Sequence, residues 1–241
     1  VSDGEGGTAE AELVITINGH SNTPPFLTPE DHNDVGGVAI DGHVTVHEKG
    51  LDDGTDPGQG HTAEGKIQIS AMDGLTSITI AGTEVLLADL QDLANTPVTI
   101  NVAGGELTLT GFDPLIVTKL GVDKVLGGDL KYTYELTADQ DHPAGEGNNS
   151  LTLDIQLGVK DDQDVSSIDA DNQLIVNVID DVPSAEDDAN QITEDATDPA
   201  EGNVLTNDTT GAVGATVTKI EVACQSYAVP GGGAVTIAGE Y

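Results

Sequence analysis

Apolar residues in the middle of the chain recur at every second position, in short runs separated by turn-forming residues. The longest run spans residues 151–159, where leucine, isoleucine and valine alternate with threonine, aspartate, glutamine and glycine. This period is typical of a β-strand with one buried face. Shorter runs of the same kind occur at 66–70, 78–80, 98–102, 107–109, 131–136 and 174–178. Only residues 84–93 have helical spacing, so the pattern predicts an all-β fold with at most one short helix.

A strand followed by a proline-marked linker occurs twice in the chain. Residues 11–18 alternate and lead to Pro24 and Pro25, and residues 174–178 alternate and lead to Pro183. Proline lacks the N–H that a sheet needs, so both places indicate the end of a domain. The spacing predicts tandem Ig-like or cadherin-like β-sandwich repeats. Their predicted bounds are 1–27 for the last strand and linker of a preceding repeat, 28–182 for a long central repeat, and 183–241 for the N-terminal part of a following repeat.

Residues 183–241 are rich in acids and turn-forming residues and carry few apolar anchors. Their weak pattern predicts short strands near 189–193, 203–205, 216–223 and 234–238. The chain begins within an acidic turn and ends after a strand-like run. We therefore expect it to be a piece of a longer protein.

The chain carries 43 acidic residues against seven lysines and no arginine, and its formal net charge is -36. A compact body with this charge repels itself, and the sequence has no polybasic segment that could offset the repulsion. The acids, mostly aspartates, gather with glycine and asparagine where the strand patterns end. Clustered oxygens in turns suit Ca²⁺, which takes about 6–8 oxygen ligands. We therefore expect a secreted β-protein whose acidic turns bind calcium.

The same charge argues against nucleic-acid partners, because binding a phosphate backbone needs lysine and arginine. No apolar run approaches the ~20 residues of a membrane span, so we expect no membrane insertion. Cys224 is the only cysteine, which excludes an internal disulfide framework and leaves metal as the usual staple. The sequence contains no nucleophile elbow, metalloprotease helix, phosphate loop or dinucleotide fingerprint. It therefore predicts that the chain is not an enzyme.

Five phrases of the central region carry a family resemblance: VHEKGLDDG (46–54), GKIQISAMDGLTSITIAGT (65–83), GGELTLTGF (104–112), YTYELTADQDHP (132–143) and LIVNVIDDVPSA (174–185). In this order they resemble the long repeats of giant RTX adhesins, which Gram-negative bacteria export by type I secretion. The opening DGEGGTAEAELVITINGHSNTPP resembles the tail of a VCBS or cadherin-like repeat, and ITEDATDPAEGNVLTND (192–208) is similar to the start of another VCBS-type repeat.

The resemblance implies Ig-like or cadherin-like sandwiches, Ca²⁺ at domain junctions and loops, and adhesion at the extracellular bacterial surface. Neighbouring repeats of the same chain would be its partners. The segment DDQDVSSIDADN (161–172) departs from the pattern, since the long repeat usually carries a glycine-bearing aspartate turn there. A calcium site at this turn would therefore differ in geometry from the site of the resembled repeats.

Candidate calcium ligands fall into four acidic clusters. The junction holds Asp180, Asp181, Asp187, Asp188, Glu194 and Asp195, and the turn after residue 160 holds Asp161, Asp162 and Asp164. The loop 138–150 offers Asp139, Asp141, Glu146 and Asn148, and the turn 50–65 offers Asp52 and Asp53, with Glu48 just before it, where the resembled repeats carry an acid. Such charge runs are also ordinary in solvated linkers and surface loops. His142 fits a loop residue better than a zinc ligand, because no second His or Cys has a supporting spacing.

Two functions are consistent with these patterns. The first is a calcium-binding spacer and adhesion module of a bacterial surface adhesin. The second is a calcium-dependent binding module, because the central repeat at 28–182 is longer than a plain sandwich of ~100 residues. Its pocket would be formed by residues 138–150 and 50–65 and would bind a surface peptide or glycan.

Overall fold

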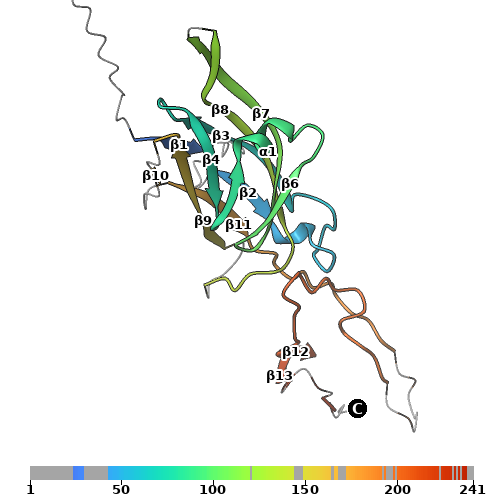
Figure 1. The fold of residues 1–241 in the computed structure, drawn as a ribbon. Helices are drawn as coiled ribbons and strands as arrows, with labels where there is room; N and C mark the ends of the chain where they lie inside the picture. The colour runs from blue at the N-terminus through green and yellow to red at the C-terminus, as the bar shows by residue number, and fades with distance from the viewer. Residues whose placement is uncertain are drawn as a thin grey trace, which may run out of the picture.

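The fold is seen in a computed structural model, which describes residues 24–29, 43–119, 121–143, 149–163, 166–167, 172–191, 193, 198, 200–222, 224–229, 231, 233 and 235–237. Most of the described chain forms two β-sheets that pack face to face in a sandwich-like arrangement (Figure 1). The chain after the last strand of the sandwich leaves at one end and carries a small separate hairpin (Figure 1).

The first sheet has five strands in the order β1-β3-β8-β7-β6, and every neighbouring pair is antiparallel. Its strands are β1 (Phe26–Pro29), β3 (Thr62–Ser70), β6 (Val98–Val102), β7 (Gly105–Lys119) and β8 (Val122–Leu136). The long β7 and β8 extend past the other strands as a two-stranded arm (Figure 1).

The second sheet has the order β2-β11-β9-β4-β5, with β10 paired to β9. Its strands are β2 (Val44–His47), β4 (Leu75–Ile80), β5 (Thr83–Leu86), β9 (Ser150–Asp161), β10 (Ser166–Ser167) and β11 (Gln173–Ile179). Among the described strands, β2 and β11 are the one pair that runs in parallel. The separate hairpin consists of β12 (Lys219–Val222) and β13 (Gln225–Ala228).

The helices are short. One turn of 3-10 helix, η1 (Glu48–Gly50), follows β2 directly. The α-helix α1 (Leu87–Asp92) follows β5 and packs against β4, β5 and β7, so it contacts both sheets. It buries Leu90, and Leu93 is buried just after its end.

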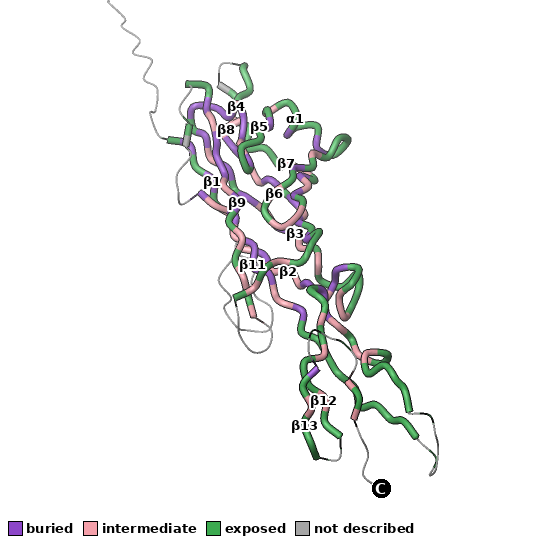
Figure 2. Tube along the Cα trace, turned by 90° about the horizontal axis from the view of Figure 1, so that it is seen from below, coloured by how far each residue is buried: buried purple, intermediate pink, exposed green. Residues whose placement is uncertain are grey.

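The core is built from the alternating positions of the strands. Burial is concentrated in the two sheets, whereas the chain beyond residue 182 is mostly exposed (Figure 2). The buried residues are largely aliphatic, and Tyr132 and Tyr134 of β8 are the aromatic members of the core among the described residues. Opposite Tyr132 stands Gly65 of β3, where a Cβ would lie 2.3 Å from the tyrosine hydroxyl. Glycine at this position therefore makes room for the ring.

Two turns show how glycine fixes the connections. Gly104 has a φ of 72° in the tight turn between β6 and β7, and a Cβ there would also lie 2.8 Å from the Tyr134 hydroxyl oxygen. Gly74 has a φ of 106° in the turn that carries the chain from β3 in the first sheet to β4 in the second. L-residues adopt this backbone region at a cost, so glycine is favoured at both positions.

The structure confirms the strands predicted in the central region. It also confirms a short α-helix there, at 87–92 of the predicted 84–93, but residues 84–86 of that range belong to strand β5. Of the four strands predicted after Pro183, the described residues contain one, β12 within 216–223, and its partner β13 at 225–228 was not predicted. Residues 203–205 were predicted as a strand, but Asn203 Oδ1 accepts a hydrogen bond from the Leu205 N–H at 3.0 Å and folds them into a turn. The described parts of 189–193 and 234–238 contain no strand.

The strand predicted at 11–18 lies outside the described residues. The proposed domain bounds at 27 and 182 and the tandem Ig-like or cadherin-like arrangement stay predictions. The described residues establish one mainly-β, sandwich-like body with a mostly exposed segment after it.

The two core tyrosines allow a matched test of this packing. The Tyr134 hydroxyl donates to the Ala103 carbonyl oxygen at 2.8 Å, whereas the buried Tyr132 hydroxyl has no hydrogen-bond partner within the described chain. We expect Tyr134→Phe to lower the free energy of unfolding by about 1 kcal/mol. Tyr132→Phe should leave it unchanged or raise it, because it removes a buried polar atom that lacks a partner. Urea denaturation of both variants measures the difference, and equal losses would contradict it.

Candidate functional site

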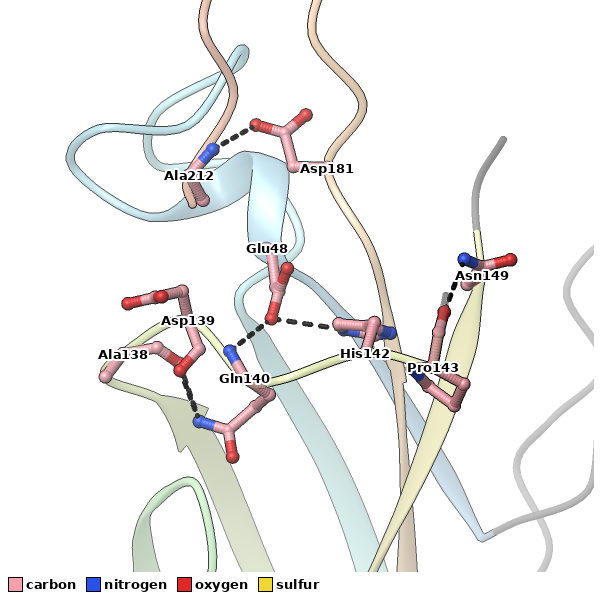
Figure 3. Close-up of polar contacts among 9 residues, drawn as sticks. All are labelled: Glu48, Ala138, Asp139, Gln140, His142, Pro143, Asn149, Asp181 and Ala212. Carbon is pink, nitrogen blue, oxygen red and sulfur yellow. Dashed lines mark hydrogen bonds and ion pairs between the residues drawn. The ribbon is translucent and has the colours of Figure 1, made fainter. Parts of the chain in front are cut away.

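Three acidic segments that are far apart in the sequence meet at one end of the sandwich (Figure 3). They are η1 with the turn after it (48–60), the loop that follows β8 (137–143), and the residues directly after β11 (180–181). The Gln140 N–H donates to Glu48 Oε1 at 2.6 Å and joins the first two segments. The Thr55 N–H donates to Asp181 Oδ2 at 2.8 Å and joins the first to the third.

Strand pairing explains why these segments meet. β2 and β11 run in parallel with His47 opposite Ile179, so the next residues along the chain, Glu48 and Asp180, emerge side by side. β3 and β8 pair with Thr62 opposite Glu135, which brings the turn before β3 next to the loop after β8. The Leu136 N–H accordingly donates to the His61 carbonyl oxygen at 2.8 Å.

Glu48 is the centre of this site. Its side chain is 0% exposed, although it carries a carboxylate. Oε1 accepts the Gln140 hydrogen bond and lies 3.2 Å from His142 Nε2, while Oε2 has no hydrogen-bond partner among the described residues. Burial raises the pKa of Glu48 above its ordinary value, and the Gln140 N–H and His142 oppose this rise. The nearby Asp180 carboxylate adds to it.

His142 lies beside Glu48 with its side chain only 6% exposed. Neither ring nitrogen makes a well-oriented hydrogen bond with the described part of the chain, and the contact with Glu48 becomes an ion pair only if the ring is protonated. One ligand atom each from Glu48, His142 and Asp180 all lie within 4.8 Å of one another. Two carboxylates and an imidazole so placed could together hold a metal ion.

Asp181 has a different role from its neighbour. Its side chain is buried, and its oxygens accept three hydrogen bonds: from the Thr55 hydroxyl at 2.6 Å, from the Thr55 N–H at 2.8 Å and from the Ala212 N–H at 3.0 Å. Gly211 permits the close approach, since a Cβ there would lie 2.8 Å from the Asp181 carbonyl oxygen. Asp181 thus ties the turn after η1 and the segment near residue 212 to the end of β11.

The other predicted ligands do not join this cluster. The side chains of Asp52, Asp53, Asp139, Asp141, Asp187 and Asp188 are exposed. Asp161 and Asp162 lie at the far end of β9, where Asp162 forms an ion pair with Lys124 and Asp161 Oδ1 accepts from the Gln163 N–H at 2.9 Å. Glu146, Asn148, Asp164, Glu194 and Asp195 fall outside the described residues.

Sequence reasoning missed His142 as a neighbour of Glu48. The residue does lie in a loop, as predicted, but the loop folds it against a carboxylate more than ninety residues earlier in the chain. A metal motif is recognised by short spacing, and no spacing signal connects positions this far apart. The donors to Asp181 were missed for the same reason.

Comparisons with known proteins add nothing to this picture, because no protein-family model matches the chain and no curated protein matches it significantly. The resemblance to RTX adhesin repeats therefore stays a prediction. In the part of the chain that the structure describes, helices of the length and apolarity needed to cross a membrane are absent.

Removing the Asp181 carboxylate tests its role at the end of β11. We expect Asp181→Ala to lower the free energy of unfolding by about 2–3 kcal/mol, because the buried Ala212 N–H and the part-buried Thr55 N–H and O–H lose a charged acceptor. Amide exchange should accelerate at Thr55 and Ala212, measured by hydrogen–deuterium exchange. Asp187→Ala, which removes an exposed carboxylate, is the matched control and should change stability by less than about 0.5 kcal/mol. An equal rate of amide exchange at Ala212 in both variants would show that the Asp181 side chain does not hold this segment.

Proposed function

We propose that this chain is a calcium-binding extracellular segment of a bacterial surface adhesin, acting as a stiff spacer and adhesion module. The observation that carries the proposal is the meeting of three acidic segments at the end of the sandwich where the following segment leaves. The family resemblance of the sequence points to the same function.

The charge at this end of the sandwich favours a bound cation. Eight acidic residues lie on the three segments: Glu48, Asp52, Asp53, Asp56, Asp139, Asp141, Asp180 and Asp181. Lys49, 3.3 Å from Asp56, is the one lysine on them, and residues 161–218 contain no basic residue. Two like charges 8 Å apart repel by about 0.5 kcal/mol in water and about 2 kcal/mol at an effective dielectric constant of about 20.

Repulsion of this kind subtracts from the ~5–15 kcal/mol by which an ordinary protein is stable, although water and salt screen it at the exposed carboxylates. Divalent calcium offsets this repulsion and suits the exposed oxygens of Asp52, Asp53, Asp139 and Asp141. Since the segment after Asp181 is held by hydrogen bonds to the same end, calcium there would also stiffen the connection between the sandwich and that segment.

Calcium should raise the thermal stability of the chain. At free calcium 100-fold above the dissociation constant, each site adds about 2.7 kcal/mol, which raises Tm by roughly 5–10 °C in a chain of this size. Differential scanning calorimetry in calcium and in EGTA measures this. Matched solutions of NaCl and of MgCl₂ at equal ionic strength separate specific binding from screening. An identical Tm in calcium, EGTA and NaCl would reject the proposal.

A calcium-dependent binding module is the second candidate. The specific observation in its favour is that each segment predicted to form a pocket is hydrogen-bonded to a residue next to the other. Gln140, of 138–150, donates to Glu48, and His61, of 50–65, accepts from Leu136.

We expect a surface peptide or glycan to be retained on an array in calcium and released by EGTA. Asp139→Asn combined with Asp53→Asn should weaken retention, whereas Asp113→Asn on β7 serves as the control. If neither a peptide array nor a glycan array retains the chain in calcium, the binding function is rejected and the spacer function remains.

A further inference from the structure

We propose that Glu48, His142 and Asp180 form a binding site for a transition-metal ion of the Zn²⁺ class. This site is separate from calcium binding and does not depend on the adhesin function proposed above. It rests on the geometry and burial of three side chains that are brought together from the end of β2, the loop after β8 and the end of β11.

The first observation is convergence. The three ligand atoms lie within 4.8 Å of one another, and the carboxylate of Glu48 and the imidazole of His142 are shielded from solvent, with side chains 0% and 6% exposed. Around a tetrahedral zinc ion, with bonds of about 2.0–2.2 Å, ligand atoms are about 3.4 Å apart. Small side-chain rotations would therefore close the cluster on an ion.

The second observation is independent of the first and concerns unused polar atoms. Glu48 Oε2 and His142 Nδ1 are buried and make no hydrogen bond within the described residues. A buried polar atom without a partner costs about 1–3 kcal/mol. A simple Glu48–His142 ion pair would engage Oε1 and Nε2 and would leave both of these atoms without a partner. Coordination to an ion gives at least one of them a partner.

The third observation is that Glu48 is already oriented. The Gln140 N–H holds Oε1 at 2.6 Å and so fixes the rotation of the carboxylate, with Oε2 left to bind. Hydrogen bonds that orient a ligand in this way are typical around protein-bound metals. Gln140 and His142 belong to the same loop, so one segment supplies both a ligand and the hydrogen bond that orients another.

The donor set decides the class of metal. Calcium takes about 6–8 oxygen ligands, which a cluster of three side chains including an imidazole does not supply. Imidazole suits zinc, copper, iron and nickel, and three protein ligands plus a water are a common zinc arrangement. The cluster thus selects for a smaller ion that accepts nitrogen, while calcium is left to the exposed acids around it.

Cobalt(II) is the probe, because it occupies zinc sites and its visible absorption is intense when its coordination is tetrahedral. The whole chain is titrated with CoCl₂ in excess calcium, so that oxygen-only sites are filled. We expect one equivalent of cobalt to bind with tetrahedral absorption bands and to be displaced by one equivalent of ZnCl₂. Displacement by added calcium at millimolar concentration, or no absorption at all, would overturn the proposal.

Variants identify the ligands. His142→Gln, Glu48→Gln and Asp180→Asn should each weaken cobalt binding by at least about tenfold, because even loss of a residue that only orients a ligand costs about that much. His61→Gln is the control for the histidine, since His61 is part-buried but outside the cluster. Asp141→Asn is the control for the aspartate, since Asp141 is exposed and next to His142. Equal binding by His142→Gln and wild type would overturn the assignment.

A measurement on the wild-type protein covers the case in which a variant fails to fold. X-ray absorption at the zinc edge of the zinc-loaded chain should show one imidazole and oxygen ligands around the ion. A shell of oxygen alone would contradict the proposal. Calcium binding is tested by the change in Tm, and the zinc site is tested by cobalt binding and X-ray absorption. Failure of one proposal is therefore distinguished from failure of the other.

Discussion

The parallel pairing of β2 with β11 determines what the acidic end of this protein looks like. Antiparallel neighbours send their following residues to opposite ends of a sheet, whereas parallel strands send them to the same end. Along the chain, β2 is the first described strand of the second sheet and β11 is the last. Their pairing therefore brings Glu48 next to Asp180, although more than 130 residues separate them in the sequence. This register places Glu48 beside Asp180 and Asp181, and the pairing of β3 with β8 brings the loop that carries His142 to the same end.

The core of the sandwich is almost entirely aliphatic, and its burial opposes the repulsion among the acids at one end. Two tyrosines are its aromatic members among the described residues, and Gly65 and Gly104 leave room for their hydroxyl ends. Aliphatic side chains contribute about 1.5–3 kcal/mol each when fully buried, and this burial is the main favourable term that holds the sheets together. Repulsion among the acids at one end opposes this stabilisation, and the calcium proposed above would offset that repulsion.

The sequence was sufficient for the parts of the fold that depend on local pattern. Alternation identified β3, β4, β6, β7, β8, β9 and β11, and the spacing of leucines identified α1, whereas the short strands β1, β2, β5 and β10 were not predicted. It failed at 203–205, where an asparagine side chain bonds to the backbone two residues on and turns two apolar residues away from a strand. Local hydrogen bonds of this kind compete with sheet formation and leave no mark in the hydrophobic pattern.

The candidate site was predicted only in pieces. Glu48 and Asp180 were each recognised as candidate ligands, but their contact depends on which strands pair, and single-sequence periodicity does not contain that information. His142 was correctly predicted to lie in a loop, but its burial was not predicted, because it packs against Glu48, which comes more than ninety residues earlier in the chain.

The position of β11 between β2 and β9 has a mechanical consequence. A load that pulls on the chain beyond residue 181 enters the sheet along β11, whose backbone is bonded on both sides. Since ladder hydrogen bonds lie across the strand direction, traction along the strand must shear two rows of bonds at once instead of unzipping one bond at a time. The anchorage at Asp181 stands directly at the point where that force arrives.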